Sequence, residues 1–266
     1  MDIKMLGRLS AELNGVSVVP SAAKPRQILA LLALQSGRVV TVPTLMEEIW
    51  GEDIPRSAAT TLQTYILQLR RKIAAALEGD RAWQAKDVLV TQHGGYLLEV
   101  QPGQMDVQEF DRLYAAGRDA HTAADYRSAS ELLGQALALW QGPALVDVRV
   151  GGVLELESLR LEEDRMAALE RRIDADMELG RHGEMVPELR VLAARHPMHE
   201  NFCAQLMTAL HRSNNAWRAL EAYQRLRTAL VDELGMEPSP RLQRLQQSVL
   251  NADPTLDFQV STSLAR

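Results

Sequence analysis

The sequence predicts a mainly α-helical protein in two parts. The first is a winged helix-turn-helix, with three helices, a small antiparallel sheet and a β-hairpin wing, and the second is an all-α domain of tetratricopeptide-like repeats. Within the first 100 residues, three apolar helical patterns precede a glycine-centred hairpin. From about residue 106 onward only helical patterns follow. Two of these patterns are offset by about 33 residues, close to the tetratricopeptide period.

Length and composition are those of an ordinary folded protein. The chain has 266 residues, 46% hydrophobic and 24% charged, which disfavours disorder and favours two domains. We expect domains at 1–100 and 106–252, with a flexible tail at 253–266. The single cysteine, Cys203, excludes an internal disulfide framework and fits a reducing, cytoplasmic location. The sequence also shows no secretion signal or membrane span and suggests no metal or cofactor.

The chain begins with extended segments and a short helix. Asn14-Gly15 lies between two imperfectly alternating apolar runs, which predicts a tight turn in an antiparallel sheet. After two prolines, the apolar positions between Ile28 and Leu34 predict a short buried helix that ends near Gly37. These segments supply the small sheet and the first helix of the winged domain.

A second helix is predicted to start at Thr41, whose hydroxyl can cap it. Its apolar positions include Leu45, and Gly51 is placed to end it. Glu47 and Glu48 are expected to point outward from this helix into solvent. Adjacent carboxylates of this kind are more typical of a solvated helix face than of a general acid and base pair.

The third helix is predicted from Ser57 to Leu77, followed by a hairpin around Gly94-Gly95. Its apolar positions recur at i, i+4, i+7 and i+11, and they are Leu62, Ile66, Leu69 and Ile73. At 100° per residue, the side chains opposite this stripe are Thr60, Thr64, Leu67, Gln68 and Arg71. Arg pairs with guanine, Gln with adenine, and a Thr methyl group or Leu contacts the thymine methyl group. The opposite face therefore suits reading DNA, although an exposed polar helix face has a similar composition.

Charge is divided unevenly along the chain. The overall net charge is −6, but residues 1–100 carry 11 basic and 10 acidic side chains, whereas residues 101–266 carry 18 and 25. The stretch from Arg56 to Lys72 contains four basic residues and no acid. Such a stretch can face a polyanion, and a solvated helix face is the alternative. The predicted DNA-binding residues are Arg56, Thr60, Thr61, Thr64, Gln68, Arg71, Lys72, Thr91 and His93, of which His93 is equally consistent with an ordinary turn residue.

In the second part, three helical segments begin near Asp125, Arg181 and Asn215, and the last two define the offset noted above. The span from Leu154 to Leu179 predicts one extended helix between repeats, and a short helix follows Pro240. Four aromatic residues at equivalent repeat positions, Tyr126, Trp140, Trp217 and Tyr223, favour packing over a ligand cage. A small-molecule pocket between helices would leave no period in the sequence.

Enzymatic motifs are not found in the sequence. There is no phosphate-binding GxxxxGK[ST], no GxSxG and no HExxH pattern. His196 and His199 are three residues apart, but Pro197 lies between them, so a repeat boundary is favoured over a metal site. We therefore expect a protein that is not an enzyme.

Motifs along nearly the whole chain carry a resemblance to one family. In the first half they are Met5-Leu6-Gly7, Lys24-Pro25-Arg26, Gly37-Arg38-Val39-Val40, Ile49-Trp50-Gly51-Glu52 and Gly95-Tyr96. In the second half they include Ala136–Leu145, His196-Pro197 and Asp232–Pro240. Together they resemble the small form of the Streptomyces antibiotic regulatory proteins. Where many members have Gly-Arg before the last repeat, this chain has Asn214-Asn215.

The resemblance implies an OmpR-type winged helix, the effector domain of two-component regulators, followed by a bacterial transcriptional activation domain. It implies binding to direct repeats near a promoter, head-to-tail assembly on DNA and activation of antibiotic biosynthesis genes. It also implies contact with the RNA polymerase holoenzyme, including its sigma factor. In the winged domain this contact is expected in the loop after the second helix, at Glu52, Asp53 and Ile54.

An alternative from another class is a helical-repeat protein-interaction module whose winged domain does not bind DNA. The small net charge of residues 1–100 is compatible with it. The uninterrupted basic stretch from Arg56 to Lys72 argues against it, and salt-dependent binding to nonspecific DNA would separate the two.

Overall fold

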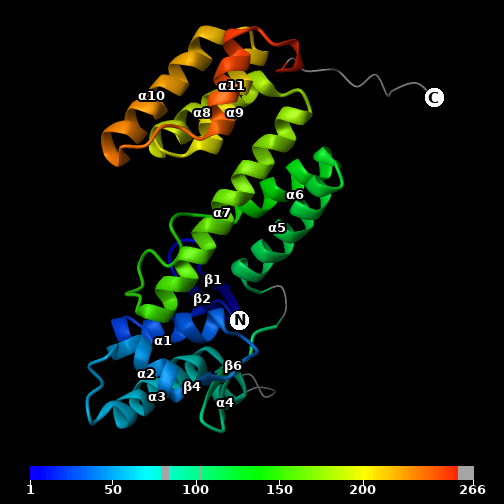
Figure 1. Ribbon diagram of the computed structural model, residues 1–266. Helices are drawn as coiled ribbons and strands as arrows, with labels where there is room; N and C mark the ends of the chain where they lie inside the picture. Colours follow the sequence, from blue (N-terminus) through cyan, green and yellow to red (C-terminus); the bar gives the residue numbers. More distant parts are fainter. Residues whose placement is uncertain (79–83, 102–103, 257–266) are drawn as a thin grey trace, which may run out of the picture. The chain divides into compact units, whose positions relative to one another are not determined.

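A computed structural model describes residues 1–78, 84–101 and 104–256 of the chain. Part of the expected tail, 257–266, lies outside the described residues, and Pro254–Leu256 forms a short 3-10 helix. Figure 1 labels most of the helices and strands. In the part of the chain that the structure describes, no helix is both long enough and apolar enough to cross a membrane.

The chain forms two compact units. Unit 1 consists of Met1–Ala115 with Gln135–Met166, and unit 2 consists of Ala116–Gly134 with Ala167–Arg266. The division falls inside three helices, which are α5 (Asp106–Thr122), α6 (Tyr126–Ala138) and α7 (Gly152–Glu178). The extended helix predicted near 154–179 is thus confirmed as α7. The predicted domain boundaries at 100 and 106 describe sequence modules and stay a prediction.

Unit 1 opens with the predicted antiparallel sheet, whose strand order is β1 (Asp2–Lys4), β2 (Ser10–Leu13) and β3 (Val16–Ser17). Asn14 and Gly15 have φ angles of 53° and 77°. Both lie in the left-handed region that a two-residue hairpin turn of this kind requires. The Asn-Gly signal in the sequence therefore identified the turn correctly.

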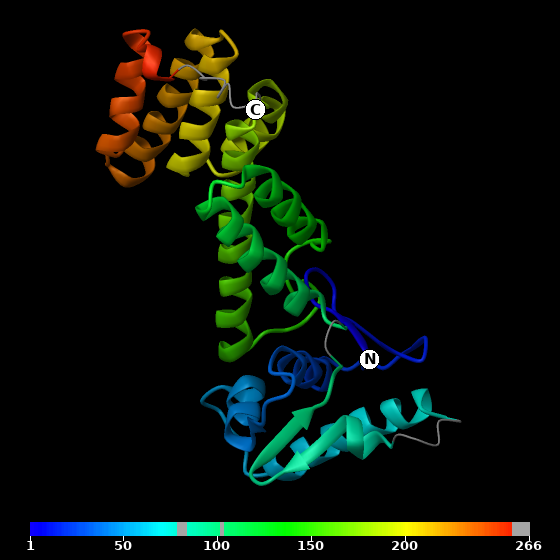
Figure 2. The same ribbon diagram turned by 90° about the vertical axis from the view of Figure 1, so that its right-hand side faces the viewer.

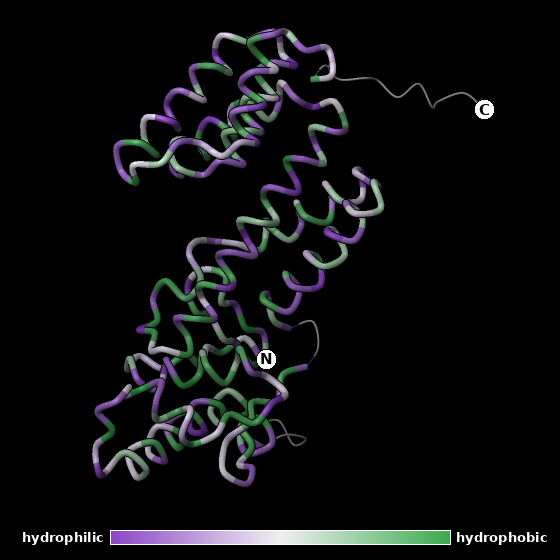
Figure 3. The backbone as a smooth tube through the Cα atoms, in the orientation of Figure 1, coloured by the Kyte–Doolittle hydropathy of each residue, from purple (hydrophilic) through white to green (hydrophobic). Residues whose placement is uncertain are grey.

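Three helices follow, α1 (Ala23–Leu34), α2 (Val42–Trp50) and α3 (Ala58–Ala76). Residues 28–33 of α1 are all buried, so this helix is enclosed on every side and forms the centre of the core. Figure 3 accordingly colours most of α1 as hydrophobic. The Thr41 hydroxyl accepts a hydrogen bond from Thr44 N at 3.3 Å, which confirms the predicted cap of α2.

The wing is a second antiparallel sheet. Its strand order is β4 (Val40–Thr41), β6 (Gly95–Leu98) and β5 (Leu89–Gln92), and the short helix α4 (Ala85–Val88) precedes β5. A Cβ atom at Gly95 would lie 2.3 Å from the Val40 carbonyl oxygen, so only glycine lets β6 approach β4 this closely. The three helices, sheets and wing confirm the predicted winged helix-turn-helix.

Glu48 corrects the expectation that both glutamates of α2 point outward. Only 2% of Glu48 is exposed, whereas Glu47 is exposed. Glu48 Oε1 accepts from Gly151 N at 2.5 Å and Gln27 Nε2 at 2.7 Å, and Oε2 accepts from Val153 N and Leu154 N at 3.0 Å. The carboxylate thus satisfies N–H groups at the start of α7, where the helix dipole also favours a negative charge.

Two more carboxylates join the sequence after residue 104 to the connection between β1 and β2 in unit 1. Asp106 accepts from the backbone N–H groups of Met5 and Leu6 at 2.8–2.9 Å, and burial raises the pKa of Asp106 above its ordinary value. Asp147 accepts from Leu9 N at 2.8 Å and pairs with Arg26 at 3.1 Å. We call Glu48, Asp106 and Asp147 the carboxylate seam.

Unit 2 contains α8 (His182–Arg195), α9 (Glu200–Arg212), α10 (Ala216–Leu234) and α11 (Pro240–Leu250). The turns that precede the three repeated segments share one geometry. Ala124, Gly180 and Asn214 all have positive φ, and the next residue donates its N–H to a carbonyl five residues earlier. Asn214 adopts φ 58° because Asn tolerates the left-handed region, so the departure from the family's Gly preserves the turn.

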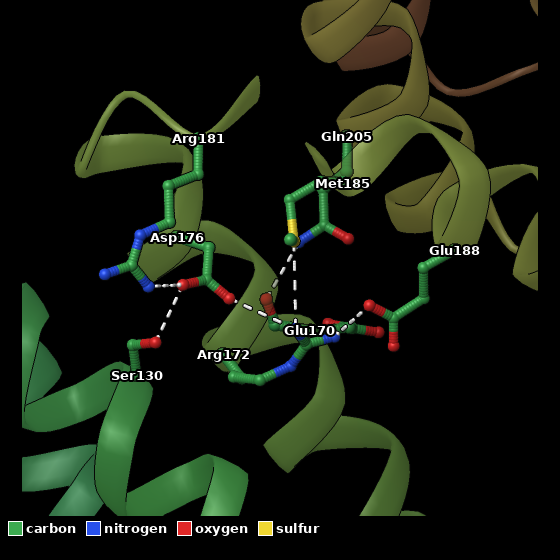
Figure 4. A network of polar contacts seen from close by, with 8 residues as sticks. All are labelled: Ser130, Glu170, Arg172, Asp176, Arg181, Met185, Glu188 and Gln205. Carbon is green, nitrogen blue, oxygen red and sulfur yellow. Dashed lines mark hydrogen bonds and ion pairs between the residues drawn. The ribbon is translucent and has the colours of Figure 1, made fainter. Parts of the chain in front are cut away.

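A buried carboxylate also organises unit 2. Figure 4 shows Asp176 of α7 accepting hydrogen bonds from Ser130 Oγ at 2.7 Å, Arg181 at 2.8 Å and Arg172 at 3.1 Å. Arg172 continues to Glu188 of α8 at 2.5 Å. The side chain of Asp176 is 3% exposed, so this charge depends on its partners for compensation.

The repeat aromatics are only partly buried. Trp140 and Tyr223 are buried and Tyr126 is half-buried, as packing residues should be. Trp217 is 64% exposed, and the expectation that it packs inside the repeat is wrong. The helical period placed Trp217 correctly at the start of α10, but position on a helix does not establish that a neighbouring helix covers the ring.

Candidate nucleic-acid interface

Helix α3 owes its orientation to the predicted apolar stripe. Leu62, Ile66, Leu69 and Ile73 are each 1–2% exposed. Ser57 and Leu77 lie at the two caps, in agreement with the predicted limits of the helix. Because this stripe is fixed in the core of unit 1, the opposite side of α3 faces solvent.

The solvent-facing side of α3 carries the predicted base-reading residues. Thr60, Thr64, Gln68 and Arg71 are all exposed, and Leu67 between them is 49% exposed. Thr64 Oγ1 donates to the Thr60 carbonyl oxygen at 3.0 Å, which fixes this hydroxyl against the helix backbone. The arrangement presents a forked guanidinium, an amide and threonine side chains along one ridge, the groups that match base edges.

Other predicted contact residues surround this ridge. Arg56, in the loop before α3, and Lys72, near its C-terminal end, are both exposed. Thr61 is half-buried, at the border between the apolar stripe and the exposed ridge. Thr91 and His93 are exposed at the β5–β6 hairpin. The exposed members of this group are placed to meet a polyanion around the ridge, whereas Thr61 offers less of its side chain.

Arg70 connects α3 to the wing, a role that the sequence analysis missed. Its Nε and Nη2 groups donate to the Leu89 carbonyl oxygen at 3.0 and 2.7 Å, and Nη2 also donates to Thr91 Oγ1 at 2.7 Å. Figure 2 shows the hairpin beside α3. A basic stretch in the sequence did not distinguish this half-buried arginine from its exposed neighbours. Arg70 is a positioning residue that fixes the distance between helix and wing.

The loop between α2 and α3 is open to solvent. Glu52, Asp53 and Ile54 are exposed, with Ile54 at 49%. Gly51 N donates to the Glu47 carbonyl oxygen at 2.7 Å and Ala58 N to the Pro55 carbonyl oxygen at 2.9 Å, so both ends of the loop are held. A short loop of this kind offers two carboxylates and one apolar side chain to a partner.

The remaining candidate groups have structural roles. His199 caps α9, since its Nδ1 accepts from Phe202 N at 3.4 Å, and its Nε2 lies 3.1 Å from Glu170. In the described ranges of the chain, no cluster of three or more His, Cys, Asp and Glu side chains is placed to hold a metal ion. Burial raises the pKa of the Cys203 thiol to about 12, so this thiol is not a nucleophile at neutral pH.

Comparison with known families gives two matches that follow one another along the chain. The family described as transcriptional regulatory protein, C terminal, matches residues 17–98. The bacterial transcriptional activator domain matches residues 105–250, more than half of the chain. The first match includes α3 and the wing, and the second includes α5 through α11.

Individual relatives are similar over nearly the whole chain. The chain is 55% identical to regulatory protein DnrI of Streptomyces peucetius, over 97% of this chain and 94% of DnrI. It is 35% identical to transcriptional regulator RedD of Streptomyces coelicolor, over 96% of this chain and 72% of RedD. It is 37% identical to regulatory protein AfsR of the same species over 95% of this chain, but spans only 24% of AfsR.

A solved structure shares the fold. Mycobacterium tuberculosis EmbR, in complex with a low-affinity phosphopeptide, superposes with a TM-score of 0.86 at 32% sequence identity. The similarity covers 95% of this chain and 65% of the EmbR chain. The predicted fold class is therefore confirmed by a protein whose structure is known.

Proposed function

The chain belongs to the family of Streptomyces antibiotic regulatory proteins, and from this premise we propose that it activates a biosynthetic gene cluster by binding direct repeats near a promoter and recruiting RNA polymerase. In this proposal residues 1–100 bind DNA and residues 106–252 act mainly as the activating part. The proposed activity requires binding to promoter DNA and to RNA polymerase, and it requires no catalytic group.

One observation carries the DNA-reading part of the proposal. The ridge of Thr60, Thr64, Gln68 and Arg71 is exposed on a helix whose opposite stripe is fixed in the core. A helix in the major groove needs such a ridge of long and short polar side chains. We assign Arg71 to a guanine and Gln68 to an adenine, because these pairings satisfy two hydrogen bonds at once.

The surrounding residues would hold the DNA backbone. Arg56 and Lys72 supply charges that attract phosphates irrespective of sequence. Thr91 Oγ1 already accepts a hydrogen bond from Arg70, so its own hydroxyl hydrogen remains for a phosphate oxygen. His93 is exposed in the turn that follows β5 and supplies a further polar group there.

For recruitment, we assign polymerase contact to the loop of Glu52, Asp53 and Ile54, with a second contribution from the acidic remainder of the chain. Residues 101–266 carry a net charge of −7, which complements basic surfaces. A contact of about 1–3 kcal/mol raises occupancy roughly 5- to 150-fold, enough for activation without a large interface. Head-to-tail protomers on DNA would place one such loop at each repeat.

Selection from a random DNA library tests the proposal. The purified full chain is incubated with the library at two salt concentrations, and the bound DNA is sequenced. We expect enrichment of a direct repeat with half-sites about one helical turn apart, and weaker binding at the higher salt concentration.

Other results would redirect the proposal in defined ways. Enrichment of an inverted repeat would contradict head-to-tail binding, because two-fold dimers select palindromes. Absence of binding even at low salt would overturn DNA recognition and favour the protein-interaction module. A direct repeat without polymerase binding, measured with the holoenzyme on the selected DNA, would reject recruitment and retain DNA binding.

A further inference from the structure

Unit 2 contains a cavity whose lining includes none of the individual residues proposed to contact DNA or polymerase. Helices α8, α9 and α10, with the connection at His196 to His199, enclose about 440 Å³. Its floor is apolar and is formed by Cys203, Leu206, Leu210 and Leu226, all of which are buried. This volume lies in the range of small-molecule pockets, about 300–1,000 Å³.

Trp217 lies at this cavity and has no packing role inside the repeat. Trp217 is one of the lining residues, and 64% of it is exposed. The Arg218 guanidinium lies 5.0 Å from the centre of the Trp217 ring. A large aromatic surface left uncovered beside an apolar floor offers stacking to a second flat ring.

The charged side chains that line the cavity are mostly arginines. Arg190, Arg218 and Arg225 line it, and Glu221 is the one carboxylate among its lining residues. Arg225 pairs with Glu221 at 2.6 Å. Among the residues that the structure describes, Arg190 and Arg218 have no carboxylate within ion-pair distance. Two guanidinium groups are therefore available to an anion at the rim.

We propose that this cavity binds a small planar aromatic carboxylic acid, with its ring on the apolar floor against Trp217 and its carboxylate at Arg218 and Arg190. The fork of an arginine matches a carboxylate, and an apolar floor disfavours a bare phosphate or sulfate. A cationic ligand is disfavoured because the Glu221 carboxylate is already paired with Arg225. This site does not depend on DNA binding.

The test uses the full chain labelled with ¹⁵N at tryptophan and the probe 2-naphthoate. Substitution Trp217→Phe identifies the indole N–H signal of Trp217. We expect 2-naphthoate to shift this signal in a saturable way, while the neutral 2-naphthylmethanol binds at least about fivefold more weakly and 2-naphthylmethylamine more weakly still.

Charge reversal supplies the matched variants. Arg218→Glu changes an exposed residue at the cavity, and Arg244→Glu changes an exposed arginine of α11 outside it. Arg218→Glu should weaken 2-naphthoate relative to the amine by about tenfold, whereas Arg244→Glu should leave both affinities unchanged. Circular dichroism confirms that both variants are folded.

Three outcomes would overturn the proposal. These are no shift of the Trp217 signal up to the solubility limit of 2-naphthoate, equal affinities for the acid, alcohol and amine, and equal weakening by Arg218→Glu and Arg244→Glu. None of these results bears on DNA recognition, since no DNA is present. A failure of the DNA selection would likewise leave the cavity proposal intact.

Discussion

Helices α2 and α3 are neighbours in the same helix-turn-helix, yet they use their polar side chains in opposite ways. Glu48 of α2 is buried and accepts four hydrogen bonds from Gln27 and the start of α7. Arg71 of α3 is exposed on a ridge turned to solvent. Both residues belong to amphipathic helices, so amphipathicity alone did not distinguish a buried structural charge from an exposed charge that is free to bind a partner.

The difference lies in what each side chain meets. Glu48 faces backbone N–H groups that have no partner inside their own helix, so removing the carboxylate leaves buried donors unsatisfied. Arg71 faces water until another molecule arrives, so removing it costs little in the free protein. The comparison therefore predicts that α2 charges control folding and α3 charges control binding.

The largest effect is expected for Glu48→Ala. It leaves the backbone N–H groups of Gly151, Val153 and Leu154 without their acceptor, whereas Gln27 keeps its hydrogen bond to the main-chain carbonyl oxygen of residue 48. We expect a loss of about 3–5 kcal/mol in the free energy of unfolding. Urea unfolding followed by circular dichroism measures this loss. Glu47→Ala on the exposed side of α2 is the control, with a change within about 0.5 kcal/mol. Equal effects of the two substitutions would show that water replaces the buried acceptor and that the comparison fails.

A smaller effect, and of the opposite kind, is expected for Arg71→Ala. Affinity for the selected DNA should fall by about 1–3 kcal/mol with relaxed preference at one base pair, while the urea midpoint stays unchanged. Lys72→Ala is the matched variant, because a phosphate contact weakens all sequences alike and lowers the salt slope by about one. Identical base preference for wild type and Arg71→Ala would remove Arg71 from the recognition residues.

The smallest effect is expected for Arg70→Ala, which sharpens the comparison because Arg70 is a charged residue of α3 whose hydrogen bonds are made within the protein. Losing its bonds to Leu89 and Thr91 should cost about 1 kcal/mol of stability and speed amide exchange in the β5–β6 hairpin. Arg70→Lys keeps the charge but not the fork, so it should restore long-range attraction to DNA and not the protection of the hairpin. Full protection in Arg70→Lys would argue against a role for the forked geometry.

The sequence was informative where one local pattern decides the structure. The Asn14-Gly15 turn, the Thr41 cap and the apolar stripe of α3 all follow from rules that concern neighbours along the chain. Partners far apart in sequence were not predictable in this way. No residue near Glu48 in the sequence indicates that Gly151 packs against it. The approach is close, since a Cβ at Gly151 would lie 2.1 Å from the Glu48 carbonyl oxygen.

The exposed ridge of α3 was predictable from the sequence, whereas base partners for its side chains were not. Periodicity correctly placed Thr60, Thr64, Gln68 and Arg71 on the exposed side of α3, but exposure does not identify a base partner. The sequence also grouped Arg70 with the exposed basic residues because charge and spacing are the same for a surface arginine and for one that bridges two elements. The prediction that Trp217 packs inside the repeat was wrong because no sequence pattern shows which aromatic side chain stays uncovered by its neighbours.

The carboxylate seam has a consequence for exchanging parts between relatives. Asp106 and Asp147 hold the backbone of the connection between β1 and β2, and Glu48 holds the first turn of α7. Acceptors and donors therefore come from both sides of the junction near residue 100. A hybrid gene that joins residues 1–100 of one regulator to the helical part of another would separate these carboxylates from the N–H groups that they accept from. A hybrid that keeps the carboxylate seam intact has to transfer these carboxylates and the Gly151–Leu154 turn together with residues 1–100.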